Sequence, residues 1–211
     1  MEGPPPLGAA ELHAWLRGAG AARDAATTAK LAQFLNLLVR WNRVHNLTGA
    51  RGARELVQRH LVESLALEPW LAGERVADVG SGAGFPGLPL AIAVPQRHFT
   101  LIESRAKRAH FLRHAVASLA LDNAAIAHSR AEDLRPVPPF DTVLARAVAR
   151  PARLLAIAAA LMAPGSLLLV LTSAELAGRF REAHGGFAVR EVAAAAGLPS
   201  TIVALERTRA G

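Results

Sequence analysis

The chain has 211 residues, which is enough for one well-cored domain with a small appended piece. Hydrophobic residues make up 52% and charged residues 19%, so the composition indicates an ordinary globular protein and excludes an intrinsically disordered one. Because the chain has no cysteine, a disulfide framework, a thiolate metal site and a cysteine nucleophile are excluded. A reducing compartment, the cytoplasm, is the expected location.

The formal net charge is +7, and arginine outnumbers lysine by 22 to 2. A basic surface suits a polyanionic partner, since each neutralised phosphate releases counterions, although a biased codon composition would give the same numbers. Residues 1–6 have no basic start and no apolar run, so no signal peptide is expected. The long apolar stretch 154–171 is interrupted by Pro164-Gly165, which predicts a helix, a turn and a strand and no membrane partner.

Helices dominate the first third of the chain. Three are predicted: over residues 10–17, over a segment that Thr27-Thr28 caps and that runs to Trp41, and over residues 54–67. Gly73 ends this part. We therefore expect an N-terminal helical region, residues 1–73, that packs on the following domain or forms part of it.

From residue 74 onward, strands alternate with helices. Strands are predicted at 76–79, 98–103, 124–128, 140–145 and 166–171, helices at 105–119 and 151–162, and two weaker strands at 187–193 and 200–206. Alternation of this kind implies right-handed crossovers and a mostly parallel sheet that is covered on both faces. The predicted fold class is α/β, with residues 74–211 forming the sheet-containing domain.

The first strand runs into a glycine-rich turn, Asp78-Val79-Gly80-Ser81-Gly82-Ala83-Gly84. In an open parallel sheet, ligands bind beyond the carboxyl ends of the strands, and glycine lets the backbone approach a ligand closely. Glu103 ends the next strand, 19 residues after Gly84, where a carboxylate can accept hydrogen bonds from both ribose hydroxyls of an adenosine. The turn therefore predicts an adenosine-containing cofactor on Gly80, Gly82, Gly84 and Glu103.

Two cofactor classes contain adenosine and must be weighed. The segment Gly82-Ala83-Gly84-Phe85-Pro86-Gly87 also matches the dinucleotide fingerprint GxGxxG, in which free amides at a helix start hold a pyrophosphate. Pro86 and Pro89 remove two of those amides. Asp78 adds a negative charge that disfavours a diphosphate and suits the ammonium of a sulfonium amino acid. S-adenosyl-L-methionine is therefore favoured, and an NAD(P)-dependent oxidoreductase is the alternative.

Further site candidates follow the third and fourth strands. Ala131 and Glu132 are placed to meet an adenine edge, although a solvated turn explains these residues equally well. Arg146 follows the fourth strand directly, and together with Arg130 and Arg150 it is a candidate to face an anionic or purine substrate. No metal site is expected, because His110 and His114 stand four apart on a basic segment without an acidic third ligand.

The whole pattern resembles the glucose-inhibited division protein B family over roughly residues 40–172. The matching elements are Trp41-Asn42, Asn46-Leu47-Thr48, residues 59–64, the glycine turn through Phe85-Pro86-Gly87, Leu101-Ile102-Glu103-Ser104, Lys107-Arg108, Phe111-Leu112, Ser129-Arg130-Ala131-Glu132 and Ala145-Arg146-Ala147. The resemblance implies a class I methyltransferase (Rossmann-like) seven-stranded sheet whose last strand is antiparallel. It also implies cofactor contacts at Gly80, Phe85, Ala131-Glu132 and Arg146.

The activity that the resemblance implies is transfer of a methyl group to N7 of a guanine in small-subunit (16S) ribosomal RNA. The expected partner is that RNA or the 30S particle, and the enzyme is expected to be a monomer. Arg130 and Arg146 would orient the target base or phosphate. A phosphate-gripping surface would be formed by arginines 40, 43, 51, 54, 59, 105 and 108 with Lys107, although a solvated face explains the arginines of the helical region almost equally well.

The chain departs from the family pattern at three places. Glu63 stands where the family commonly has aspartate, and Leu171-Thr172-Ser173 stands where it often has lysine followed by glycine. The closing segment, residues 197–207, is also short and lacks the arginine expected before its last strand. A catalytically inactive RNA-binding relative is therefore a third hypothesis.

Overall fold

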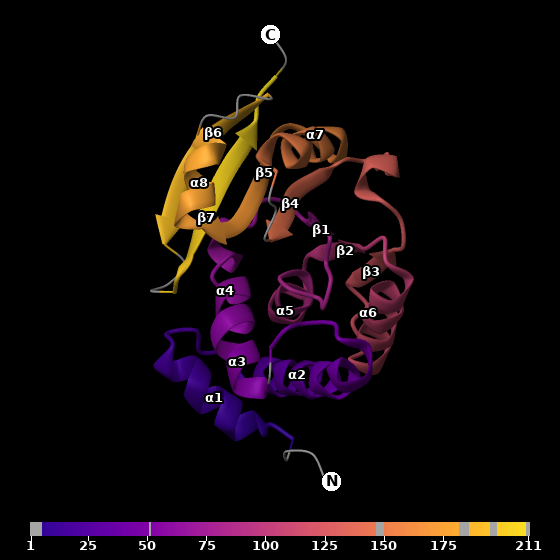
Figure 1. Cartoon of the computed structure of the whole chain (residues 1–211), viewed down its shortest axis with the longest axis vertical. Helices are drawn as coiled ribbons and strands as arrows, with labels where there is room; N and C mark the ends of the chain where they lie inside the picture. Colours follow the sequence, from indigo (N-terminus) through magenta and orange to yellow (C-terminus); the bar gives the residue numbers. More distant parts are fainter. Residues whose placement is uncertain (1–5, 51, 147–149, 182–185, 195–197, 210–211) are drawn as a thin grey trace.

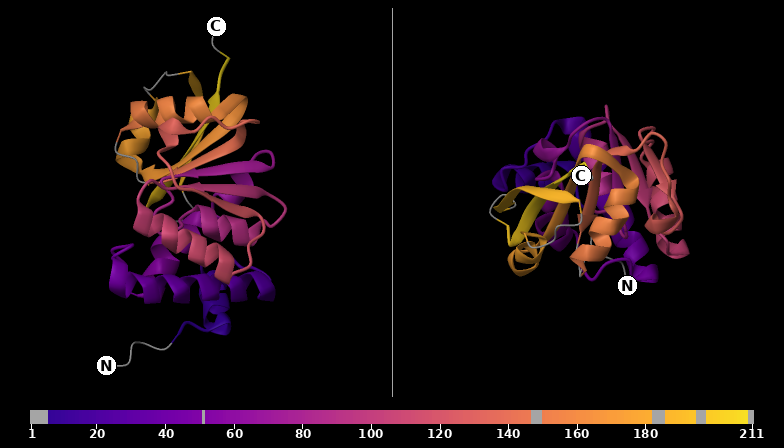
Figure 2. Two further views of the ribbon diagram at one scale, coloured as in Figure 1. Left: turned by 90° about the vertical axis from the view of Figure 1, so that its right-hand side faces the viewer. Right: turned by 90° about the horizontal axis from the view of Figure 1, so that it is seen from above.

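A computed structural model describes residues 6–50, 52–146, 150–181, 186–194 and 198–209. A twisted sheet forms the middle of the molecule, and helices cover both of its faces (Figures 1 and 2). The N-terminal helices lie at one end of the long axis and the β6–β7 hairpin lies at the other (Figure 1). This arrangement confirms the predicted α/β class with an N-terminal helical extension.

The helical extension contains six short and long segments. They are α1 (Ala9–Gly18), α2 (Ala25–His45), α3 (Ala53–Leu56), the π-helical segment η1 (Val57–Leu61), α4 (Val62–Leu65) and the 3₁₀ turn η2 (Glu68–Trp70). The predicted cap of α2 was wrong: Asp24 is the N-cap, because its side chain accepts a hydrogen bond of 2.9 Å from the Thr27 amide. Thr27 and Thr28 lie inside the first turn of the helix.

The sheet has seven strands in the order β3-β2-β1-β4-β5-β7-β6. Their bounds are β1 Arg75–Val79, β2 His98–Ile102, β3 Ala124–Ala127, β4 Phe140–Arg146, β5 Met162–Ser173, β6 Phe187–Ala194 and β7 Ser200–Arg207. The first five strands are parallel, and β7 is antiparallel to both β5 and β6. The chain adds β2 and β3 on one side of β1 and then returns to add β4 and β5 on the other side. The boundary between β1 and β4 is therefore the topological switch point, which is where ligands bind in open parallel sheets.

One strand is longer than predicted. Pro164-Gly165 was expected to form a turn before the fifth strand, but β5 begins at Met162 and includes both residues. The pairing of β4 with β5 shifts register between Phe140 and Thr142, and Gly165 has a φ of +90°. A bulge of this kind explains why the strand tolerates proline and glycine there.

Helices on the two faces make separate packing layers. The segments that follow the sheet strands are α5 (Gly87–Ala93), α6 (Ala106–Ser118), the 3₁₀ turn η3 (Ala131–Asp133), α7 (Pro151–Leu161) and α8 (Ala174–Arg181). α5 and α6 pack with α2 on one face, through Leu88, Leu101 and Phe111, whereas α7 and α8 pack on the other, through Leu154, Val170 and Phe180. Among the described residues, no helix combines the length and the apolar character that crossing a membrane requires.

Candidate functional site

The glycine turn after β1 is built for close backbone approach. Gly80, Gly82 and Gly84 have φ values of +73°, +56° and +93°, a region that favours glycine. A Cβ on Gly84 would lie 2.6 Å from Leu88 Cδ1, so packing also demands glycine there. A Cβ on Gly80 would meet no atom within 4 Å, so the turn faces open space at this residue.

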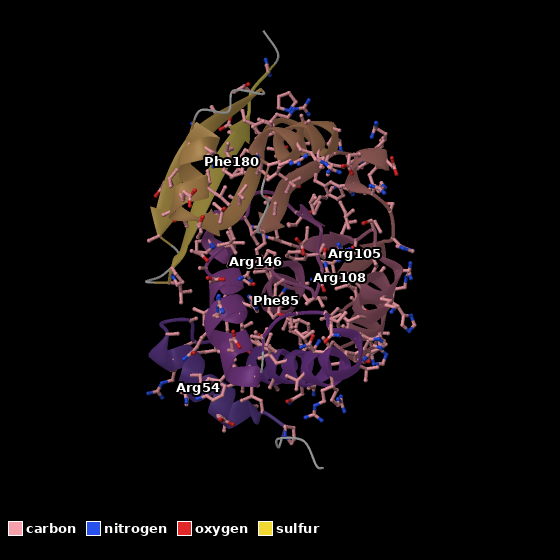
Figure 3. All side chains as sticks on the ribbon, viewed as in Figure 1. Arg54, Phe85, Arg105, Arg108, Arg146 and Phe180 are labelled. Atoms are coloured by element: carbon pink, nitrogen blue, oxygen red, sulfur yellow. The ribbon has the colours of Figure 1, made fainter. Side chains whose placement is uncertain are left out.

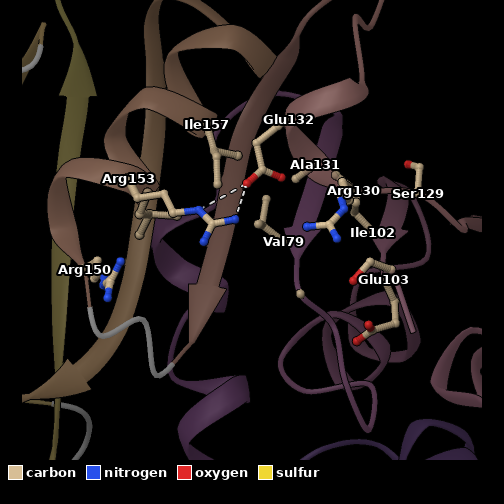
Figure 4. A pocket seen from close by; sticks show the side chains of 13 residues that line it. Val79, Ile102, Glu103, Ser129, Arg130, Ala131, Glu132, Arg150, Arg153 and Ile157 are labelled. Atoms are coloured by element: carbon tan, nitrogen blue, oxygen red, sulfur yellow. Dashed lines mark hydrogen bonds and ion pairs between the residues drawn. The ribbon is translucent and has the colours of Figure 1, made fainter. Parts of the chain in front are cut away.

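A cavity of about 370 Å³ lies at the carboxyl ends of β1 and β2 (Figure 4). Its lining residues come from both strands, the β3–η3 segment and α7: Val79, Gly80, Ile102, Glu103, Ser104, Ser129, Arg130, Ala131, Glu132, Arg150, Arg153, Leu154 and Ile157. Gly80, Glu103, Arg130, Ala131 and Glu132 are residues that the sequence singled out. The structure therefore brings together residues from four separate parts of the chain at the predicted edge of the sheet.

Glu103 occupies the cavity wall in a fixed position. Its side chain is only 5% exposed, and its two carboxylate oxygens accept hydrogen bonds from the Gly82 amide (3.0 Å) and the Arg105 amide (2.8 Å). Each oxygen keeps a second lone pair. The carboxylate thus holds the glycine turn in place and can still accept hydrogen bonds from a ligand.

Asp78 lies beneath the turn and is almost completely buried, at 1% exposure. Its Oδ2 accepts a hydrogen bond of 3.1 Å from the Gly87 amide, whereas Oδ1 is buried without a hydrogen-bond partner among the described residues. Burial raises the pKa of Asp78 to about 7, and the nearby Glu103 charge raises it further. The Gly87 amide and the Ser81 hydroxyl, which donates to the Asp78 backbone carbonyl at 2.9 Å, lower it. A buried carboxylate oxygen without a donor is the kind of group that a bound cation would satisfy.

Glu132 lies across the cavity from Glu103, and its carboxylate already accepts hydrogen bonds from Arg153. Arg153 Nε and Nη2 donate to its Oε1 at 3.1 and 2.6 Å (Figure 4). The hydrogen bond from Arg153 lowers the pKa of Glu132. Arg153 and Ile157 were not predicted as site residues, although residues 150, 153, 154 and 157 share one face of a helix that starts beside the cavity.

Arg146, at the end of β4, lies in a second group of polar residues. Its Nη2 donates to the Arg59 carbonyl at 2.7 Å and forms an ion pair with Glu63, which also accepts a hydrogen bond from Ser200. Arg146 Nη1 is buried and has no hydrogen-bond partner among the described residues. One guanidinium nitrogen therefore anchors the side chain, and the other is a buried donor without a partner among the described residues.

Phe85 and His60 lie close to Arg146. The Phe85 ring lies 5.3 Å from Phe34 and 5.2 Å from the His60 imidazole, centroid to centroid. Burial, and secondly the charge of Arg146, lower the pKa of His60 to about 4, so the imidazole is neutral at pH 7. His60 belongs to the π-helical segment η1, and such segments are frequent at functional sites.

Several predicted site residues are not in the cavity of Figure 4. Asp78, Gly82 and Gly84 support its wall from behind, and Phe85 is buried in the core. Arg130 and Arg146 were expected to act together, but Arg130 lines the cavity and Arg146 is anchored to η1 and α4. Thr172 is buried with its hydroxyl unpartnered among the described residues, and Ser173 accepts from the Leu176 amide at the start of α8. Arg51, Ala147 and Gly197 lie outside the described residues.

The fold and the glycine-turn cavity define the class of the protein. The structure matches a crystal structure described as a SAM-dependent methyltransferase from Aquifex aeolicus, with a TM-score of 0.59 over 72% of this chain and 93% of that one. The identity of 18% supports the fold alone. The fold is that of the class I methyltransferases, as the sequence predicted.

Sequence comparison then identifies the family. A family model described as GidB, rRNA small subunit methyltransferase G, matches residues 27–195. The chain is 47% identical over 148 residues, 70% of each protein, to ribosomal RNA small subunit methyltransferase G of Xanthomonas axonopodis pv. citri. It is 43% identical over 169 residues, 80% of each, to the protein of that name in Stenotrophomonas maltophilia. The chain belongs to this family, which confirms the resemblance seen in the sequence.

Proposed function

We propose that the protein transfers a methyl group from S-adenosylmethionine to N7 of a guanine in 16S ribosomal RNA. Family membership supports the substrate class. The assignment of the cofactor rests on one structural observation: Glu103, a buried carboxylate that two backbone amides hold in place, lines a cavity beside an open glycine turn. The proposal includes a monomeric enzyme whose substrate is either free 16S RNA or the 30S particle. Membership in a methyltransferase family argues against the nicotinamide-dependent alternative.

The residues at the glycine turn fit the proposed cofactor. Glu103 would accept hydrogen bonds from the ribose hydroxyls, and Ala131 and Glu132 would border the adenine. Asp78 Oδ1 is a buried anionic acceptor without a donor, and the ammonium group of the methionine part would supply one. Gly80 leaves room for the cofactor to pass against the backbone.

When bound, S-adenosylmethionine supplies an electrophilic methyl group on a positively charged sulfur. Guanine N7 carries an in-plane lone pair, so no residue of the chain has to remove a proton from the base. The chain must instead hold the base in line and compensate the charges of the bound groups. The carboxylates of Asp78 and Glu103 place negative charge on the cofactor side of the site.

Arg146 is the residue that we assign to the substrate side. Its anchored guanidinium keeps one buried donor, Nη1, for an acceptor oxygen of the guanine or of a phosphate. Arg130, exposed at the cavity rim, would contact the RNA backbone. Neutral His60 would add no charge beside the methylated purine, which gains a positive charge when N7 is alkylated.

A calorimetric titration tests the cofactor assignment. Replacing Glu103 with alanine (Glu103→Ala) should weaken binding of S-adenosylmethionine by about 1–3 kcal/mol, because two ribose hydrogen bonds are lost. The control is Asp133→Ala, since Asp133 is exposed on η3 one residue beyond Glu132. An unchanged affinity in Glu103→Ala, or micromolar binding of NAD(P) to the unaltered protein, would end the assignment.

A transfer assay tests the reaction. Small-subunit RNA from cells that lack the modification is incubated with the protein and S-adenosylmethionine, and the methylated base is mapped. One new N7-methylguanine is expected. Tight RNA binding with no transfer would instead support the inactive relative suggested by Thr172-Ser173.

A further inference from the structure

A second hollow lies on the surface between α2 and α6. It has a volume of about 400 Å³ and is lined by Leu37, Arg40, Trp41, Val44, His45 and His114. We call it the Trp41 hollow. Val44 at its edge is 74% exposed.

Aromatic rings gather around Trp41. Its centroid lies 5.0 Å from His45, 5.2 Å from His114, and 5.5 Å from both His110 and Phe111. Among the described residues, no set of three or more histidine and acidic side chains is arranged to hold a metal ion. The imidazoles and Phe111 are tilted against Trp41 by 37–58°, so they form a cluster of rings around the indole. Aromatic side chains of this kind are platforms for nucleobases in single-stranded nucleic acid.

The charge around the hollow has one sign. Residues 25–50 and 104–121, which contain α2 and α6, include seven lysines and arginines and no aspartate or glutamate. The basic residues are Lys30, Arg40, Arg43, Arg105, Lys107, Arg108 and Arg113. Two helices that carry only basic charged residues beside a cluster of aromatic rings are complementary to single-stranded nucleic acid.

The helix α6 extends from the glycine turn, which its Arg108 side chain reaches, to the Trp41 hollow, which His114 lines. A Cβ on Gly82 would lie 3.7 Å from Arg108 Nη1, so the first turn of α6 reaches the glycine turn. His114 follows Arg108 by six residues, about 9 Å along a helix. In the view of Figure 3, Arg105 and Arg108 project onto the middle of the molecule.

We propose that the Trp41 hollow binds an unpaired nucleotide of the substrate RNA, with its base against Trp41 and its phosphates on the cations of α2 and α6. This inference rests on the proposed function, because it assigns the contacts that hold RNA beside the methylated guanine. Methylation at a base edge requires an accessible nucleotide, and RNA-binding proteins usually read unpaired nucleotides by stacking.

Kinetics with Val44→Glu test the proposal. The substitution places a negative charge at an exposed edge of the hollow and leaves the core intact. The KM for unmodified 16S RNA should rise about tenfold, whereas kcat and the Kd for S-adenosylmethionine stay unchanged. Val137→Glu is the matched control, since Val137 is 93% exposed and precedes β4 at the opposite end of that strand from the cofactor site.

Equal KM values for Val44→Glu and Val137→Glu would overturn the proposal while leaving the methyltransferase assignment intact. A defect seen with 30S particles but absent with free 16S RNA would also overturn it, because the hollow would then contact a ribosomal protein. Absence of methylation by the unaltered protein would be a failure of the proposed function instead.

Fluorescence gives a direct test of stacking. The chain has three tryptophans and no tyrosine, so emission reports Trp15, Trp41 and Trp70 alone. A single-stranded decauridylate should quench part of the emission, and this part should be missing in Trp41→Phe and present in Trp15→Phe and Trp70→Phe. Quenching that survives in Trp41→Phe would exclude a base on that ring.

Discussion

The carboxyl group of Asp78 lowers the stability of the cofactor-free fold, and the same group is expected to bind the cofactor. The carboxyl is buried, its pKa is raised to about 7 by that burial, and Oδ1 has no hydrogen-bond donor among the described residues. An ionised, half-satisfied carboxylate costs folding free energy. The same property prepares the site for a cationic ligand, since binding would supply the missing partner.

The variant Asp78→Asn should therefore stabilise the cofactor-free protein. In the unfolded chain the carboxyl ionises near pH 4, whereas in the native state it keeps its proton up to about pH 7. The native state binds more protons in this window, so its free energy of unfolding falls as pH rises from 4 to 7 and then stays low. Asparagine does not titrate, so the variant should gain about 2–4 kcal/mol at pH 8 and nothing at pH 4.

Urea unfolding at pH 4, 6 and 8 measures this difference. In the same variant, binding of S-adenosylmethionine should weaken. The unaltered protein should bind the cofactor more tightly as pH rises through 7, because Asp78 then ionises, and this pH dependence should be absent in the variant. A variant that is less stable than the parent at pH 8 would mean that the carboxylate is satisfied by groups other than those described above.

At the scale of elements, the π-helical segment η1 sets the orientation of two helix faces. The Val62 amide donates to the Val57 carbonyl five residues earlier, so one extra residue is accommodated between α3 and α4. Each residue turns an α-helix by about 100°. The extra residue lets Leu56 and Val57 face the core while Glu63, further along, meets Arg146.

Deleting Gln58, an exposed residue of η1, should convert the segment to a regular α-helix. Either Leu56 and Val57 would then turn away from the core, or Glu63 would turn away from Arg146. Because Arg146 would lose its position in either case, methyl transfer should fall by about 100-fold. Gln58→Ala keeps the length of the segment and should retain activity within about twofold. Circular dichroism should show the same helix content in both variants, so that the loss of activity in the deletion variant is due to misaligned side chains and not to an unfolded helix. Full activity in the deletion variant would show that η1 has no role in alignment.

Local signals in the sequence predicted most elements, and the differences arise where tertiary contacts decide. Hydrophobic periodicity located the sheet strands, but only pairing with β4 reveals that β5 continues through Pro164-Gly165. α5 was not predicted, because its seven residues follow the glycine turn and contain Pro89. The site follows the same rule: the glycine turn and Glu103 are visible in sequence, whereas the contact of Arg146 with Glu63 spans 83 residues and needs the fold.

At the scale of the whole molecule, the helical region 1–73 and the sheet domain 74–211 share one core. Phe34 of α2 packs edge-on against Phe85 at 5.3 Å, and one continuous cluster joins Leu12, Leu31, Leu88 and Phe111. The Thr142 hydroxyl exchanges hydrogen bonds with the Ala72 backbone at 2.7 and 3.0 Å. We propose that the two regions fold as a single unit.

Calorimetry should then show one unfolding transition whose calorimetric and van't Hoff enthalpies agree. Phe34→Ala should destabilise this single transition by about 3–5 kcal/mol, because it leaves a cavity in the shared core, and should not split it in two. The isolated fragment 74–211 would expose the faces of α5 and α6 that α2 covers, so it should lack a cooperative transition. Two transitions in the intact chain, or a folded fragment 74–211 that binds S-adenosylmethionine, would show that the helical region is a separate domain.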